Sequence, residues 1–118
     1  MAGTAFKIVN LEKMTIELQP DQSRDGGPQT RMSVMYTGSE MQVAIVSVPP
    51  NGTIPYETHE GEQFIRIEAG EGRINIGMDD FHDLKSGDAI VIAAGVQHKV
   101  VASKSGLRFY TVYAPPAH

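Results

Sequence analysis

The chain has 118 residues, of which 41% are hydrophobic and 20% are charged, as is typical of a single globular domain with one core. Its formal charge of −4 argues against non-specific binding to nucleic acid, which needs a basic surface. The absence of cysteine excludes disulfides and thiolate ligands, so any bound metal would be held by nitrogen and oxygen atoms.

The N-terminal part is predicted to contain two short strands and a long loop. Residues 5–9 and 14–18 show the alternation and β-branched content of strands. Residues 19–31 contain two prolines, two glycines and almost no apolar side chain, which predicts an exposed loop. Two interpretations of this loop stay open, a solvated connection and a lid over the mouth of a barrel, because long loops in compact domains are often functional.

The remainder is predicted to form short strands separated by turns. Strands are expected at residues 32–37, 41–48, 73–77, 81–84, 89–93, 99–103 and 107–113. Turns are expected at residues 38–40, 49–52, 70–72, 78–80, 85–88 and 104–106. No segment keeps the 3.6-residue period of a helix. About ten short strands predict an all-β sandwich or barrel, and the final Ala-Pro-Pro-Ala-His segment is expected to form a tail.

Four polar side chains of the metal-ligating kind are predicted to meet inside this sheet. Glu57 and His59 lie two positions apart, so that both leave the same face of a strand. A tight turn at residues 60–62 returns the chain at Gln63, and His98 follows a buried strand. Such groups are costly to bury among apolar side chains unless something satisfies them, so we expect the four to surround one site.

Two stretches of the chain resemble the paired motifs of the cupins, a family of small jelly-roll β-barrels. The first motif reads Gly, five residues, His-x-His, three or four residues, Glu, six residues, Gly. It is matched, with a gap of four instead of five, by Gly52, Glu57-Thr58-His59, Gln63 and Gly70. The second reads Gly, five residues, Pro-x-Gly, two residues, His, three residues, Asn. It is matched by Gly87, Gly95 and His98, with Ala93 and Ala102 at the Pro and Asn positions.

This resemblance implies a single-domain cupin β-barrel, the double-stranded β-helix, over residues 1–118, with the conserved barrel at about 34–114. In metal-bearing cupins the four ligand positions are usually three His and one Glu. Here they become Glu57, His59, Gln63 and His98. Two imidazoles with one carboxylate form a donor set that suits Mn, Fe, Co, Ni or Zn.

The resemblance therefore implies a divalent transition metal in the barrel that binds or acts on a small polar metabolite. Oxygenase, isomerase, lyase and decarboxylase chemistry all stay open. The alternative is a metal-free cupin that binds a sugar or small organic acid without catalysis, its four polar side chains satisfied by hydrogen bonds. A buried carboxylate without a cation or other partner costs free energy, and this favours the metal.

Other polar and aromatic residues are weaker candidates. His82 is expected at the surface of a hairpin, and His118 in a mobile terminal tail. Glu60 and Glu62 are expected at the rim of the site. Five further residues are candidates to line the pocket or a dimer interface: Tyr56, Phe64, Arg66, Tyr110 and Tyr113. Of these, Phe64 and Arg66 are predicted to face outwards, because their parity is opposite to that of Gln63.

A homodimer is predicted from the apolar character of both faces of residues 41–48. Met41, Val43 and Ile45 share one face of this strand, and Ala44, Val46 and Val48 share the other. One of the two faces lines the barrel, and the other would leave an apolar stripe facing outwards. The outward stripe is expected to pair with a second copy, unless strands 5–18 cover it within one chain. No apolar run has the length of a membrane span, and the first ten residues contain no signal-peptide core. We therefore expect a cytoplasmic protein without membrane or nucleic-acid partners.

Overall fold

The computed structural model describes residues 7–8, 19–20 and 30–118. The strands predicted at 5–9 and 14–18, and most of the predicted loop at 19–31, lie outside the described residues. Those residues at the ends of the predicted loop that the structure describes are in strands or buried. Gln19–Pro20 forms a two-residue strand paired with Arg31 and Met32, and Thr30 is buried.

The described part of the chain is all β, as predicted, and contains no helix that could cross a membrane. Its strands are β1 Gln19–Pro20, β2 Arg31–Thr37, β3 Gln42–Val48, β4 Thr53–Glu57, β5 Glu62–Ile76, β6 Asp80–Lys85, β7 Ala89–Ile92 and β8 His98–Ala114. All of the strand pairs are antiparallel. The predicted hairpins at 38–40 and 78–80 are confirmed, and the turn at 49–52 is closed by a bond from the Gly52 N–H to the Pro49 carbonyl.

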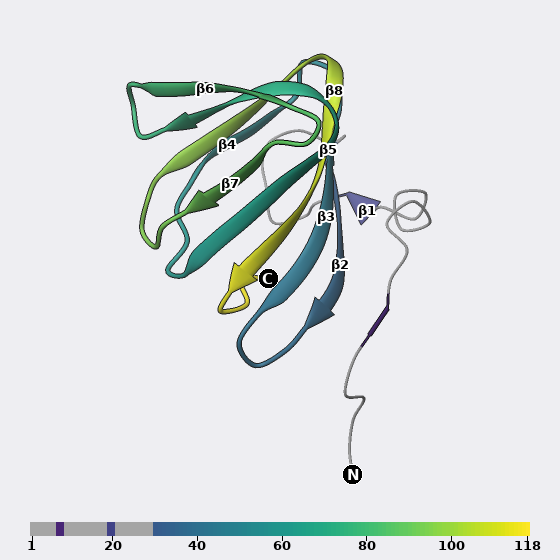
Figure 1. The fold of residues 1–118 in the computed structure, drawn as a ribbon, viewed down its shortest axis with the longest axis vertical. Helices are drawn as coiled ribbons and strands as arrows, with labels where there is room; N and C mark the ends of the chain where they lie inside the picture. Colours follow the sequence, from purple (N-terminus) through teal and green to yellow (C-terminus); the bar gives the residue numbers. More distant parts are fainter. Residues whose placement is uncertain (1–6, 9–18, 21–29) are drawn as a thin grey trace.

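Two long strands, β5 and β8, belong to both layers of the barrel. The first half of β5 pairs with residues 107–114 of β8, in a sheet that also contains β1, β2, β3 and β7. The second half of β5 pairs with residues 98–102, in a sheet completed by β4 and β6. In the view of Figure 1, β2 and β3 lie on one side of these long strands, and β4, β6 and β7 lie on the other.

The strands bend from one sheet to the other at two glycines. Gly70 and Gly106 have φ angles of +85° and +77°, which favour glycine, and a Cβ at Gly70 would overlap the carbonyl oxygen of Gly106. The prediction that strands end in turns at 70–72 and 104–106 is therefore wrong, because β5 and β8 continue through these residues. Both glycines instead bend a continuous strand, and a register shift between Gly70 and Gly72 accompanies the bend.

The main core fills the space between the two sheets. Its buried members come from the six strands β3 to β8: Val46, Val48, Ile54, Ile65, Ile67, Ile74, Leu84, Ile92, Val100, Ala102, Leu107 and Phe109. Gln63 is buried on the same inward parity as Ile65 and Ile67, while Phe64 and Arg66 are half-buried on the other face. The inward position predicted for Gln63 is thus confirmed by its burial.

A second, smaller cluster covers the outer face of the first sheet. Met35 and Ile45 are buried there, with Val43 and Tyr110 packed against them. The Lys7 ammonium donates to the Met35 carbonyl at 2.6 Å. The outward stripe predicted along β3 is therefore not left in water at Ile45, which is fully buried within one chain.

Candidate metal centre

The candidate site lies at the mouth of the barrel, where β4 ends and β8 begins. Glu57 and His98 are paired across these two strands. His59 follows the end of β4 instead of belonging to a strand, which corrects the predicted strand geometry. Its position is set by the loop before β8, because the Gly95 N–H donates to the His59 carbonyl at 2.9 Å. The two motifs of the sequence are joined by this bond.

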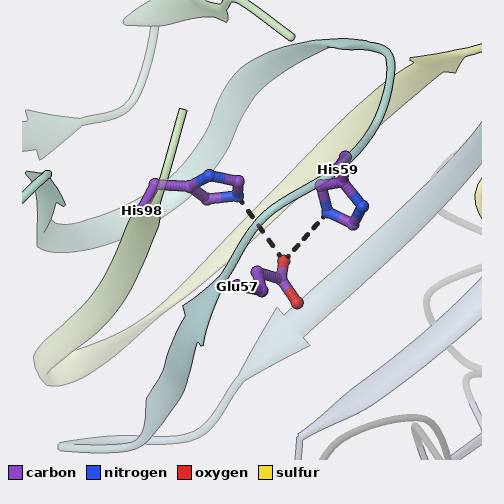
Figure 2. A group of neighbouring side chains, drawn as sticks. All are labelled: Glu57, His59 and His98. Atoms are coloured by element: carbon purple, nitrogen blue, oxygen red, sulfur yellow. Dashed lines mark hydrogen bonds and ion pairs between the residues drawn. The ribbon is translucent and has the colours of Figure 1, made fainter. Parts of the chain in front are cut away.

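Three of the four predicted side chains converge on one point, as Figure 2 shows. Oε1 of Glu57 lies 3.3 Å from Nε2 of His59 and 3.6 Å from Nε2 of His98. The three ligating atoms all lie within 4.8 Å of one another. Donor atoms placed about 2.1 Å from a shared metal ion are about 3–3.5 Å apart, so these spacings are close to those of a coordinated set.

His98 presents an acceptor nitrogen to this point. Its Nδ1 lies 3.0 Å from the Val96 carbonyl, which only accepts, so Nδ1 carries the proton and donates. In the neutral ring Nε2 then keeps its lone pair, and this atom is buried without a hydrogen-bond partner among the described residues. A hydrogen bond through the second nitrogen is the usual way in which a protein orients a metal-ligating histidine.

Gln63 also holds a buried acceptor without a partner. The Thr111 hydroxyl donates to the Phe64 carbonyl at 2.9 Å, so its oxygen accepts the bond from Nε2 of Gln63 at 3.0 Å. These two bonds fix which end of the amide is nitrogen. The Oε1 atom of Gln63 is left buried and unpartnered within the described chain. Gln63 is paired with Tyr113, whose ring lies 5.1 Å from that of His59, so it belongs to the same end of the barrel.

These residues fit a divalent metal better than a closed hydrogen-bond network. A network would pair each buried acceptor with a donor, yet His98 and Gln63 both keep an acceptor atom without one. Two neutral imidazoles, one carboxylate and one amide oxygen would leave a net charge of +1 around a divalent ion. This donor set belongs to the nitrogen and oxygen ligands that first-row transition metals accept.

The weaker candidates lie outside this group. His82 is exposed and pairs with Asp80 at 2.7 Å on the surface of the β6 hairpin. Glu60 and Glu62 lie at the rim, where they line a cavity of about 280 Å³ with His59 and Tyr113. Tyr56 donates to the Gly77 carbonyl at 3.1 Å and is thereby engaged in holding a turn. Phe64 and Tyr110 pack against each other on the outer face.

Sequence reasoning missed His118, which it placed in a mobile tail. The His118 ring lies 5.0 Å from the ring of Tyr113 and 6.3 Å from that of His59. The tail is held there by Gln42, whose Oε1 accepts from the backbone N–H groups of residues 117 and 118. One signal was present in the sequence, since Gln42 is polar at the start of a strand whose other members are almost all apolar.

The comparisons with known proteins decide the family. The model of the cupin domain matches residues 44–113, which is more than half of the chain and spans Glu57, His59, Gln63 and His98. The chain belongs to the cupin family. The matched range begins within β3 and ends within β8, so the family assignment and the barrel describe nearly the same segment.

Three relatives extend this comparison. The uncharacterized protein YrkC of Bacillus subtilis (strain 168) is 33% identical to this cupin over 96 residues, which cover 75% of this chain and 52% of YrkC. The chain thus spans about half the length of this curated relative. The BH2720 protein of Bacillus halodurans has 29% identity and a TM-score of 0.77, over 98% of this chain and 84% of its own. The polyketide cyclase RemF of Streptomyces resistomycificus has a TM-score of 0.80 and 20% identity, over 94% of this chain and 80% of the RemF chain. At this level of identity the similarity shows the fold alone.

Proposed function

We propose that this cupin binds one divalent transition metal ion through Glu57, His59, Gln63 and His98, and uses it to bind or transform a small polar metabolite. The observation that carries the proposal is the buried Nε2 atom of His98, which has no hydrogen-bond partner among the described residues and lies 3.6 Å from Oε1 of Glu57. A lone pair and a carboxylate oxygen repel each other at close range unless a cation or a proton lies between them.

The chain supplies orientation and charge at this site. The Val96 carbonyl holds the His98 ring in one tautomer, and Thr111 holds the Gln63 amide with its oxygen free. A single carboxylate leaves the divalent ion with a net positive charge, which would favour an oxygen or nitrogen donor on the ligand. Bound in this way, the ion would supply Lewis-acid polarisation or a template for a chelating substrate. The cavity of about 280 Å³ beside His59 suits a small molecule.

The proposal is tested by the metal content of untagged protein. We expect about one transition metal ion per chain in the wild type, and at least about a hundredfold weaker metal binding in His98→Ala, because that variant loses an imidazole ligand. His82→Ala is the matched control, since His82 is exposed and pairs only with Asp80 in the described contacts. Far-UV circular dichroism should show the same β content in all three proteins.

Two outcomes would count against the proposal. A wild-type protein that remains metal-free after dialysis against Mn, Fe, Co, Ni and Zn would favour the alternative, a binding module for a sugar or small organic acid without metal. Full retention of metal in folded His98→Ala would show that the metal is held elsewhere.

We further propose that two copies of the chain pair through the outer face of the first sheet. An apolar row crosses this face in register, from Tyr36 to Val43, Val112, Phe64 and Val91. Its two ends, Tyr36 and Val91, are 45% and 71% exposed. Exposed apolar rows of this kind mark interaction surfaces, and a two-fold dimer is the commonest closed assembly.

A further inference from the structure

The strands β6 and β7 leave one side of the barrel open. Among the described strands each of them pairs only with β5, β6 with its second half in one sheet and β7 with its first half in the other. The two strands are joined by the turn at residues 86–88, where the Gly87 N–H donates to the Ile67 carbonyl at 2.9 Å. Beyond this turn no strand pairing in the described chain connects β6 to β7, so the edges of the two sheets stay apart.

The opening holds a cavity of about 580 Å³ with a mostly apolar wall. The wall includes three buried core residues and three partly buried residues that pack against the core: Ile74, Leu84 and Ile92, and Ile76, Ile90 and Val96. Four partly buried apolar residues of the described chain pack against the main core, so three of the four lie at this one cavity. Pockets that bind small molecules typically have volumes of about 300–1,000 Å³ and mostly apolar walls with a few polar groups.

The polar groups of this wall favour positive charge. Asp83, Asp88 and His82 line the cavity, and no lysine or arginine of the described chain does. Arg73, which pairs with Asp83 between β5 and β6, is placed over the Phe81 ring at 5.2 Å and is not part of the wall. Two carboxylates beside an apolar surface attract a cation and repel an anion.

We propose that the cavity between β6 and β7 is a binding site for a small amphipathic cation, an amine that carries a hydrocarbon chain or an aromatic ring. The apolar body packs against the isoleucine side chains, and the ammonium group lies at the part of the wall formed by Asp83 and Asp88. Burial of hydrocarbon supplies most of the affinity, and the carboxylates supply orientation and the preference for positive charge. None of the four residues of the proposed metal centre lines this cavity, so the cation site is separate from that centre.

The test uses alkylammonium ions from butylammonium to octylammonium as probes, and the isoleucine δ1-methyl NMR signals as the readout. Four isoleucines line the cavity and should shift, and four that lie elsewhere in the barrel are internal references: Ile74, Ile76, Ile90 and Ile92, and Ile45, Ile54, Ile65 and Ile67. Affinity should rise about fourfold with each methylene that becomes buried. Octanoate, which has the same number of carbons and the opposite charge, should bind at least about fivefold more weakly than octylammonium.

Two sets of variants test the position and the charge of the site. Ile90→Trp fills the cavity and should weaken octylammonium binding by about tenfold or more, because less hydrocarbon can be buried. Val101→Trp is the matched control, since Val101 is also half-buried on a strand but does not line the cavity. Asp83→Asn combined with Asp88→Asn should remove the preference for octylammonium over octanoate. The amide oxygen at position 88 can still accept the bond from the Lys85 N–H that the carboxylate accepts now.

Three results would count against the proposal. Shifts of the reference isoleucines as large as those in the cavity, or an affinity that does not depend on chain length, would overturn the site. Shifts confined to the cavity with equal affinity for octylammonium and octanoate would overturn the cationic class of ligand. Unchanged octylammonium binding to folded Ile90→Trp would place the probe elsewhere. The methyl shifts are measured on the wild type, so they decide the position of the site even if Ile90→Trp does not fold.

Discussion

His98 and Gln63 each bury an acceptor atom that has no partner in the described part of the chain. In both residues the opposite end of the polar group is bound to a fixed acceptor, so the free atom cannot be exchanged for a donor by a simple flip. An apolar side chain at either position would avoid the cost of desolvation. Two such atoms at the end of the barrel that holds Glu57 and His59 are what a cation site requires.

At the residue scale, Gln63→Glu should strengthen metal binding by about tenfold or more. The second carboxylate lowers the net charge around a divalent ion from +1 to zero, and opposite charges in contact attract by several kcal/mol at a protein-like dielectric. Without metal, the same variant should be less stable than the wild type, because two carboxylates then repel at the mouth of the barrel. Competition titration against a metal indicator, together with thermal melts of metal-free and loaded protein, measures both effects.

Thr111→Val is the companion variant, because it preserves shape while removing the hydroxyl that orients the Gln63 amide. It should weaken metal binding a few-fold, as expected when a fixed ligand becomes free to turn. Metal affinities equal to wild type in both variants would place Gln63 outside the coordination sphere and leave a three-residue site.

At the element scale, the barrel depends on the bends of β5 and β8. Both strands cross from one sheet to the other, β5 at Gly70 and β8 at Gly106. Gly70 pairs with Leu107, and the carbonyl oxygen of the adjacent Gly106 would overlap a Cβ at Gly70. Because the first half of β5 carries Gln63 and the first residue of β8 is His98, these bends determine how the two sheets meet around the site.

Gly70→Ala should therefore destabilise the fold by about 2–5 kcal/mol. A left-handed backbone costs a residue with a Cβ about 1–2 kcal/mol, and the overlap with the Gly106 carbonyl adds an overpacking cost of about 1–3 kcal/mol. Gly77→Ala is the matched control, since Gly77 also has a positive φ of 62° but has open space around the added carbon. Urea unfolding of the two variants should separate the costs, and equal losses of stability would contradict a steric role for the Gly70–Gly106 contact.

The sequence predicts where most of the strands lie, but it does not predict which neighbouring segments form one continuous strand. Alternation and turn residues correctly placed β2, β3, β6 and β7, because each of these ends at a true reversal of the chain. The same signals divided β5 and β8 into halves. A glycine with positive φ suits a reversal and a bend within a strand equally well, and only pairing between strands far apart in sequence decides between them.

The residues of the site that lie within the two motifs could be predicted from the sequence, but a residue placed by a contact between distant parts of the chain could not. Spacing within the two motifs identified Glu57, His59 and His98, which converge, and the burial of Gln63. His118 was missed because its place depends on Gln42, which is 76 residues away in the chain. No local pattern encodes that contact. A buried amide at the edge of an apolar strand indicates only that some partner is required.

At the scale of the whole molecule, the outer face of the first sheet differs from what the pattern of β3 alone suggests. The stripe along β3 is interrupted, because Ile45 is fully buried within one chain. The exposed apolar surface runs instead across the strands, through the row from Tyr36 to Val91. Because this row crosses five strands, it offers a broader apolar surface than one strand does, and a second copy of the chain could pack against it face to face.

We expect this row to hold a homodimer, and Val112→Lys at its centre to yield a monomer. A lysine buried in the middle of the interface would place a charge from each copy near the two-fold axis, which combines desolvation with repulsion. Met78→Lys is the control, since Met78 is 69% exposed but lies in the turn between β5 and β6, away from the row. Light scattering at micromolar concentration should give twice the chain mass of 12.8 kDa for wild type and Met78→Lys, and the single mass for Val112→Lys. A wild-type mass of one chain would rule the dimer out, and a Val112→Lys protein that stays dimeric while folded would move the interface to another face.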